Sequence, residues 1–78
     1  MTLSQDDVIE FIRSNLGVSD ALDGDTELFS GGLLDSVSMV DLIGFIEERS
    51  GATIHPADVT LENFDTAARI VAYVRSLG

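Results

Sequence analysis

The chain has 78 residues, enough for one small domain with a correspondingly small core. Fourteen acidic residues against four arginines and no lysine give a net charge of −10, which disfavours nucleic acid or an anionic membrane as a partner and favours basic protein surfaces. The absence of cysteine excludes a disulfide scaffold and a thiolate zinc site, so we expect a cytoplasmic protein. We also expect it to be a monomer. Residues 1–78 are interpreted as one domain, because the acidic start resembles neither a signal peptide nor a membrane anchor and no linker or repeat follows.

The first predicted helix covers about residues 5–16. Ser4, with Asp7 three residues later, is close to a capping box, and Leu3 can pack on Val8 beyond it. Gly17 supplies a left-handed stop. The apolar stripe of this helix is formed by Val8, Ile9, Ile12 and Leu16, with Phe11 beside it.

Residues 17–34 form a long loop, because they lack helical periodicity and contain four glycines. Its apolar residues predict that it is pinned to the core; they are Leu28, Phe29, Leu33 and Leu34. A calcium-binding loop is the alternative. Counted from Asp23, however, the required glycine position holds Leu28 and the bidentate glutamate position holds Leu34, so this alternative is rejected.

The second predicted helix begins at Ser36, with Asp35 as its N-cap, and ends at Gly51. The Ser36 hydroxyl should therefore face solvent at the start of the helix. At about 100° per residue, four apolar residues fall in one sector and predict the core face, with Phe45 at its edge. These four are Met39, Leu42, Ile43 and Ile46.

The opposite side of this helix combines valines, a glycine and acids. A purely solvated face rarely carries such valines together, so we interpret it as a docking face for a partner; scattered surface apolar residues are the alternative. The predicted docking face consists of Val37, Val40, Asp41, Gly44, Glu47 and Glu48.

After Gly51, Pro56 predicts a short helical turn, and Ile54 and Val59 are expected to contact the core. Asp65 or Thr66 caps a last helix. Its apolar pattern consists of Ala67, Ile70, Val71, Val74 and Leu77, with Tyr73 alongside. The predicted fold is all-α: a small antiparallel-type bundle of three main helices plus one short helix, with a long loop between the first two helices.

The residues contain no catalytic or metal-binding constellation. A serine nucleophile at Ser36 needs a base, and the only histidine, His55, lies beyond the far end of an intervening helix, about 20 Å away at about 1.5 Å per residue. The Gly-x-Ser-x-Gly elbow and the His-x-x-x-His pair are both absent, and Gly31-Gly32 lacks the lysine of a phosphate-binding loop. We therefore expect neither an enzyme nor a metal protein.

Several motifs instead resemble the acyl and peptidyl carrier proteins, whose signature is Asp-Ser-Leu at the start of the second helix. The resemblance extends over nearly the whole chain. It is carried by Thr26-Glu27-Leu28-Phe29, Leu34-Asp35-Ser36-Val37, Val40, Leu42, Ile46-Glu47-Glu48, Gly51, Ile54, Asp58, Phe64-Asp65-Thr66-Ala67-Ala68, Ile70, Tyr73 and Val74.

The resemblance implies that Ser36, in a motif with Asp35, carries a 4′-phosphopantetheine arm transferred from coenzyme A by a magnesium-dependent phosphopantetheinyl transferase. The arm brings the thiol that the chain lacks, and an acyl or aminoacyl group travels on it as a thioester. Further implied partners are an acyl- or aminoacyl-loading ligase or acyltransferase and downstream synthase or transferase enzymes. These would meet the docking face, to which the resemblance adds Ile54.

Departures from the family pattern bear on the pathway. Val37 replaces the signature leucine, and Gly44 stands where fatty-acid carriers usually present a large apolar residue. Ser38 and Met39 replace a more polar pair. These differences favour a free-standing carrier in polyketide, nonribosomal peptide or related secondary metabolism.

Several alternatives stay open. Leu28-Phe29 with Gly32-Leu33-Leu34-Asp35-Ser36 also resembles the D-alanyl carriers, and a fatty-acid carrier is a further alternative. An unmodified small acidic adaptor and an inhibitor that mimics nucleic acid are the candidates from other classes.

Overall fold

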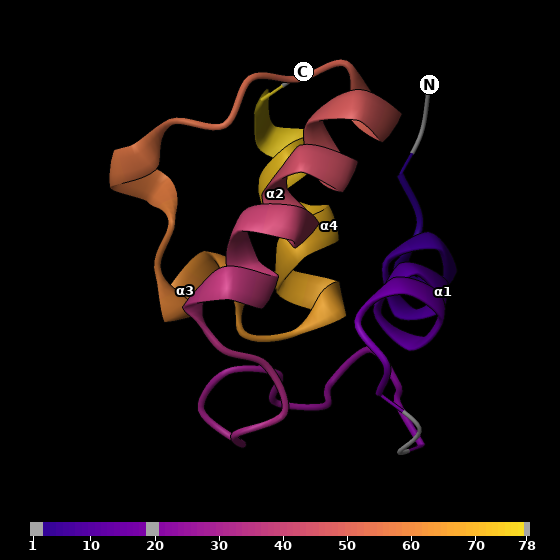
Figure 1. Cartoon of the computed structure of the whole chain (residues 1–78). Coiled ribbons are helices and arrows are strands. Elements are labelled where there is room, and N and C mark those ends of the chain that lie inside the picture. Colours follow the sequence, from indigo (N-terminus) through magenta and orange to yellow (C-terminus); the bar gives the residue numbers. More distant parts are fainter. Residues whose placement is uncertain (1–2, 19–20, 78) are drawn as a thin grey trace.

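A computed structural model describes residues 3–18 and 21–77. Throughout these residues the chain forms helices, turns and loops but no strand, as predicted. The elements are α1 (Gln5–Asn15), α2 (Ser36–Ser50), the 3₁₀ turn η1 (Pro56–Asp58), α3 (Leu61–Phe64) and α4 (Ala67–Leu77). Figure 1 shows α2 crossing in front of α4, α1 beside this pair, and the long loop that leads to α2 running along one end of the bundle. The predicted small helical bundle is confirmed.

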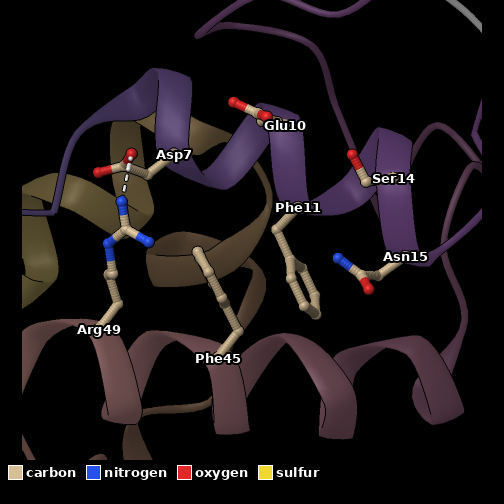
Figure 2. A pocket seen from close by; sticks show the side chains of 7 residues that line it. All are labelled: Asp7, Glu10, Phe11, Ser14, Asn15, Phe45 and Arg49. Atoms are coloured by element: carbon tan, nitrogen blue, oxygen red, sulfur yellow. Dashed lines mark hydrogen bonds and ion pairs between the residues drawn. The ribbon is translucent and has the colours of Figure 1, made fainter.

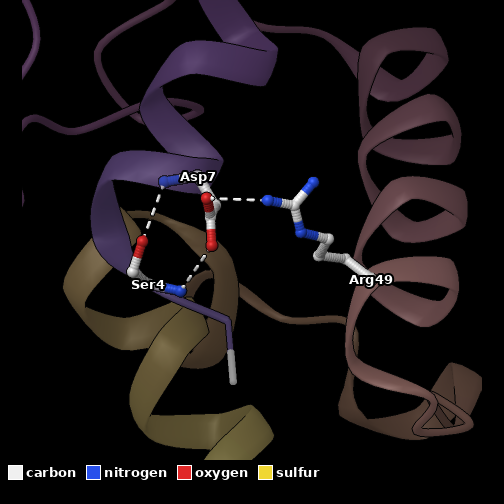
Figure 3. Close-up of polar contacts among 3 residues, drawn as sticks. All are labelled: Ser4, Asp7 and Arg49. Atoms are coloured by element: carbon white, nitrogen blue, oxygen red, sulfur yellow. Dashed lines mark hydrogen bonds and ion pairs between the residues drawn. The ribbon is translucent and has the colours of Figure 1, made fainter. Parts of the chain in front are cut away.

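The start of α1 forms the predicted capping box (Figure 3). The Ser4 hydroxyl accepts a hydrogen bond from the Asp7 backbone N–H at 3.1 Å, and the Asp7 carboxylate accepts one from the Ser4 N–H at 3.0 Å. The helix ends at Asn15, one residue earlier than predicted, because Leu16 is its C-cap. Gly17 follows with a φ of +71°, the left-handed conformation expected of it.

The core lies where α1, α2 and α4 meet. Val8 and Ile12 of α1 and Leu42 and Ile46 of α2 are all fully buried, so the predicted apolar faces of the two helices are confirmed. Leu77 differs from its prediction: it lies in the last turn of α4 and is 37% exposed, because the apolar stripe runs past the end of the core.

The segment between α2 and α4 contains one element that the sequence did not predict. Pro56 starts η1, as expected, but the single turn α3 follows separately. Its Phe64 is fully buried and lies against Tyr73 of α4, with ring centroids 5.5 Å apart. Tertiary packing of this ring, rather than helical periodicity, therefore stabilises a helix too short to be stable alone.

Of the two predicted caps for α4, the structure selects Thr66. Its hydroxyl accepts a hydrogen bond from the Arg69 N–H at 3.1 Å, whereas the Asp65 side chain points to a different part of the chain. None of the helices in residues 3–18 and 21–77 is long and apolar enough to cross a lipid bilayer.

Candidate functional site

Ser36 is the first residue of α2 and is exposed to solvent. Asp35 is the N-cap, as predicted: its backbone is extended, and its carboxylate accepts a hydrogen bond from the Ser38 N–H at 2.9 Å. This bond stabilises the ionised carboxylate and holds the pKa of Asp35 below its ordinary value. The result is a free hydroxyl at the N-terminal end of an intact 15-residue helix.

The loop before α2 delivers Ser36 to this position. Leu28 and Leu34 are buried in the core, which confirms that the loop is pinned, and the Leu34 N–H donates to the Leu28 carbonyl at 2.8 Å. Within this closed segment Gly32 has a φ of +81°, a conformation that glycine adopts without strain. The chain therefore enters α2 from a compact turn and not from a free tether.

Asp65 anchors this loop and is the site residue that sequence reasoning missed. Its carboxylate accepts hydrogen bonds from the Phe29 N–H at 3.0 Å, the Ser30 N–H at 2.9 Å and the Ser30 hydroxyl at 2.6 Å. The side chain is 3% exposed, and its bonds with the Ser30 hydroxyl and N–H hold the pKa of Asp65 below its ordinary value, against the opposing effect of burial. Its place before Thr66 suggested a helix cap, and nothing in the sequence indicates acceptance from donors about 35 residues away.

An open, mainly apolar pocket adjoins Ser36. Its volume is about 440 Å³. The lining comes from the loop, the first turn of α2 and the segment entering α3: Phe29, Leu34, Asp35, Ser36, Met39, Val59, Thr60 and Leu61. Ser36 therefore stands at the edge of a depression that offers apolar surface to a group attached to its hydroxyl.

The side of α2 that faces away from the core is open, as predicted. Val37 and Val40 are 71% and 69% exposed, and Asp41 and Glu48 are also exposed. A Cβ added to Gly44 would meet no atom within 4 Å, so the helix surface is bare there. The structure therefore brings two valines, two acids and a flat glycine together on one accessible face.

Two residues assigned to partner contact depart from this picture. Ile54 is 6% exposed and belongs to the hydrophobic core, so its expected core contact is confirmed, and little of its side chain is left for the contact with a partner that was also predicted. Glu47 is half-buried, and its carboxylate accepts a hydrogen bond from the Ile54 N–H at 2.9 Å. This bond fixes the chain as it leaves α2, so Glu47 has an internal role in addition to any contact with a partner.

Two further titratable residues that the sequence singled out, His55 and Asp23, do not line the pocket beside Ser36. His55 is exposed and directly precedes η1, in the segment that follows α2. Because α2 is helical from Ser36 to Ser50, it separates Ser36 from His55, as expected from the sequence. Asp23 of the loop caps its own turn by accepting hydrogen bonds from the Asp25 N–H and the Thr26 hydroxyl. Among the residues that the structure describes, no three His, Asp or Glu side chains gather as a metal site.

A second surface feature lies between α1 and α2. Figure 2 shows Phe11 and Phe45 facing each other from the two helices, with Arg49 beside them. The Arg49 guanidinium contacts the Asp7 carboxylate at 3.1 Å and lies 6.0 Å from the Phe45 ring centroid. The surrounding groove, about 340 Å³, is thus partly occupied by the chain's own cation.

Comparisons with known proteins relate nearly the whole chain to one family. The sequence model of a family described as "Phosphopantetheine attachment site" matches residues 6–74. The chain is 42% identical over 53 residues to a D-alanyl carrier protein of Abiotrophia defectiva, with 68% of this chain and 67% of that protein covered.

Two further similarities are to a longer biosynthesis protein and to a chain of a solved structure. Over 88% of this chain, the sequence is 44% identical to the lincomycin biosynthesis protein LmbN of Streptomyces lincolnensis, but the match spans only 26% of that protein. Among solved structures, a chain of the "Crystal structure of FAD-dependent dehydrogenase" is similar with a TM-score of 0.79 and 36% identity, covering 87% of this chain and 99% of that one.

Proposed function

Because this chain belongs to the family of carrier proteins with a phosphopantetheine attachment site, we propose that Ser36 is the residue that carries the 4′-phosphopantetheine arm. The arm supplies a thiol on which an acyl or aminoacyl group is held as a thioester. The chain itself presents that group to partner enzymes and performs no chemistry on it. The observation that carries the proposal is an exposed serine hydroxyl at the entry of α2, preceded by a capping aspartate.

The surroundings of Ser36 fit a phosphodiester on its hydroxyl. Backbone N–H groups and the helix dipole make the N-terminal end of an α-helix favourable for negative charge. The hydroxyl is exposed, so a transferase can reach it without unfolding α2. The apolar pocket lined by Phe29, Met39 and Leu61 gives alkyl portions of an attached arm a surface on which to rest.

The open face of α2 supports a role in recognition. We propose that Val37, Val40, Asp41 and Glu48 form the contact surface for the phosphopantetheinyl transferase and for the enzymes that load and use the cargo. Gly44 lets a partner approach the helix closely, since it projects no side chain. Exposed acids attract basic partner surfaces and speed association, while the valines provide the apolar centre that such contacts need.

For the pathway we propose secondary metabolism of the polyketide, nonribosomal peptide or a related type, in the cytoplasm. Similarity to a lincomycin biosynthesis protein supports this assignment. Transfer of D-alanine is the second candidate, supported by similarity to a D-alanyl carrier protein of comparable length. Loading assays separate the two, because a D-alanine ligase would charge the chain only in the second case.

The attachment is tested by measuring the intact mass after incubation with coenzyme A, magnesium and a broad-specificity phosphopantetheinyl transferase. We expect a gain of one phosphopantetheine unit, and Ser36→Ala should abolish it. Ser38→Ala is the matched control, since this serine lies two residues further on in the same helix and should be dispensable for attachment. A wild-type chain that stays unmodified with several transferases would refute the proposal.

A further inference from the structure

We infer that Asp65 is a positioning residue for the modification of Ser36: its buried carboxylate holds the loop that sets the entry of α2, and so sets the place at which the serine meets the transferase. The inference rests on the proposed attachment at Ser36. The two residues are connected through hydrogen bonds and packing, with no direct contact required between their side chains.

The first step is the attachment of the loop to Asp65. Both parts of this residue take part, since the Leu28 N–H donates to its backbone carbonyl at 2.6 Å while the carboxylate accepts from Phe29 and Ser30. A carboxylate only accepts hydrogen bonds, and three donors of the loop converge on its two oxygens. Bonds to a buried charged acceptor are stronger than neutral ones, so this turn has one strongly preferred conformation.

The second step runs from the turn to α2. Leu34 donates its N–H to Leu28, the residue held by the Asp65 carbonyl, and its side chain is 7% exposed. Leu34 is followed directly by the cap Asp35 and by Ser36. Phe29 and Leu34 also line the pocket beside Ser36, so the same turn shapes the surface around the hydroxyl. A displacement of the turn therefore displaces both the serine and its surroundings.

The third step concerns the place where Asp65 itself is held, between α3 and α4. Asp65 caps the end of α3, where its N–H donates to the Leu61 carbonyl at 3.0 Å, and the next residue caps α4. A second bond, from the Ala68 N–H to the Gly24 carbonyl at 2.9 Å, fixes the loop to the first turn of α4 at an earlier point. These hydrogen bonds attach the loop to the junction of α3 and α4. Two packed helices give a rigid support for the segment that carries Ser36.

The test measures kcat and KM for phosphopantetheine attachment with the transferase, on folded protein at a temperature well below the unfolding transition. For Asp65→Ala we expect kcat/KM to fall by about tenfold or more, because small misplacements of a reacting group are costly. Asp65→Asn keeps the shape but loses the charge, and the oxygen that accepts from the Ser30 hydroxyl becomes an amide group that can only donate to it. We therefore expect kcat/KM to fall less than in Asp65→Ala. Faster hydrogen exchange at the Phe29 and Ser30 amides should accompany both changes.

Tyr73→Phe is the matched control for stability. It removes another partly buried hydrogen bond to a carboxylate, from the Tyr73 hydroxyl to Asp58 at 2.7 Å, without touching the loop. We expect this variant to lose stability and keep wild-type attachment kinetics. Asp65→Ala with wild-type kcat and KM would overturn the inference. If Asp65→Ala does not fold, Asp65→Asn decides, and wild-type kinetics there would overturn it equally.

These outcomes differ from a failure of the proposed function. If wild-type protein gains no mass with any transferase, attachment at Ser36 is wrong. If wild-type and Asp65→Ala proteins gain mass at the same rate, attachment stands and the positioning role falls.

Discussion

The rings of Phe11 in α1 and Phe45 in α2 stack with centroids 4.3 Å apart and planes inclined by 17°. Both rings are only half-buried. The pair forms a direct aromatic contact between α1 and the helix that carries Ser36, at the edge of the main core (Figure 2). This position at the edge of the core explains why the helical spacing puts Phe11 and Phe45 beside the apolar stripes of their helices and not within them.

Removing one ring should weaken the attachment of α1. Phe45→Ala is expected to cost about 1–3 kcal/mol, less than a fully buried phenylalanine, because solvent already reaches the ring. Phe45→Leu should recover part of the loss by restoring apolar contact without stacking. Urea unfolding of both variants measures this, and equal stability of Phe45→Ala and the wild type would show that the stack contributes nothing.

Reversing the charge of Asp41 or Glu48 to lysine should separate recognition from folding. Both side chains are exposed, so the free energy of unfolding should change by within about 0.5 kcal/mol. Attachment or loading by a partner enzyme should nevertheless slow, because the lysine repels a basic partner surface. The measurement pairs a melting curve with the loading rate for each variant.

The control for that comparison is a pair of core variants. Leu42→Ala and Ile46→Ala remove fully buried side chains and should cost about 2–5 kcal/mol by leaving a cavity. They should lose fold and loading together. If the lysine variants load normally with every candidate partner, or unfold as the core variants do, the open face of α2 is not the recognition surface.

Salt should stabilise the chain. The chain has a net charge of −10, so its acidic side chains repel one another on a small surface. In the part of the chain that the structure describes, Asp7 and Arg49 form the one ion pair within 4.0 Å. Salt screens both the repulsion among the acids and the attraction in this exposed ion pair. The stability gained from the first effect should therefore exceed the stability lost from the second. We expect the melting temperature to rise between about 0.01 M and about 0.5 M sodium chloride. A melting temperature indifferent to salt would contradict this.

Acid should remove the contribution of Asp65. Its folded pKa lies below the ordinary value of 3.8, so the ionised group stabilises the native state above that value, and the contribution is lost as pH falls through the folded pKa. Other aspartates with lowered pKa act in the same direction, so the comparison with Asp65→Asn isolates this group. The difference in melting temperature between the wild type and Asp65→Asn should be largest near pH 7 and should shrink below pH ~3.8. A constant difference would count against a charged Asp65.

Much of the candidate site could be predicted from the local sequence. The boundaries of α2 follow from Asp35 and Gly51, one a side-chain acceptor for free N–H groups and the other a residue at home in the left-handed conformation. The exposure of Val37 and Val40 follows from helical spacing alone. These features depend on residues within a few positions of one another, which is why the sequence by itself determined them.

Other features were decided by contacts between distant segments. Ile54 lies in the hydrophobic core, and α3 forms a turn of its own because its buried Phe64 packs against Tyr73 of α4. Asp65 stands beside a helix cap in sequence, yet it accepts hydrogen bonds from Phe29 and Ser30. A buried carboxylate takes whichever donors the folded chain brings to it, and only the packing of the loop against the junction of α3 and α4 specifies those donors.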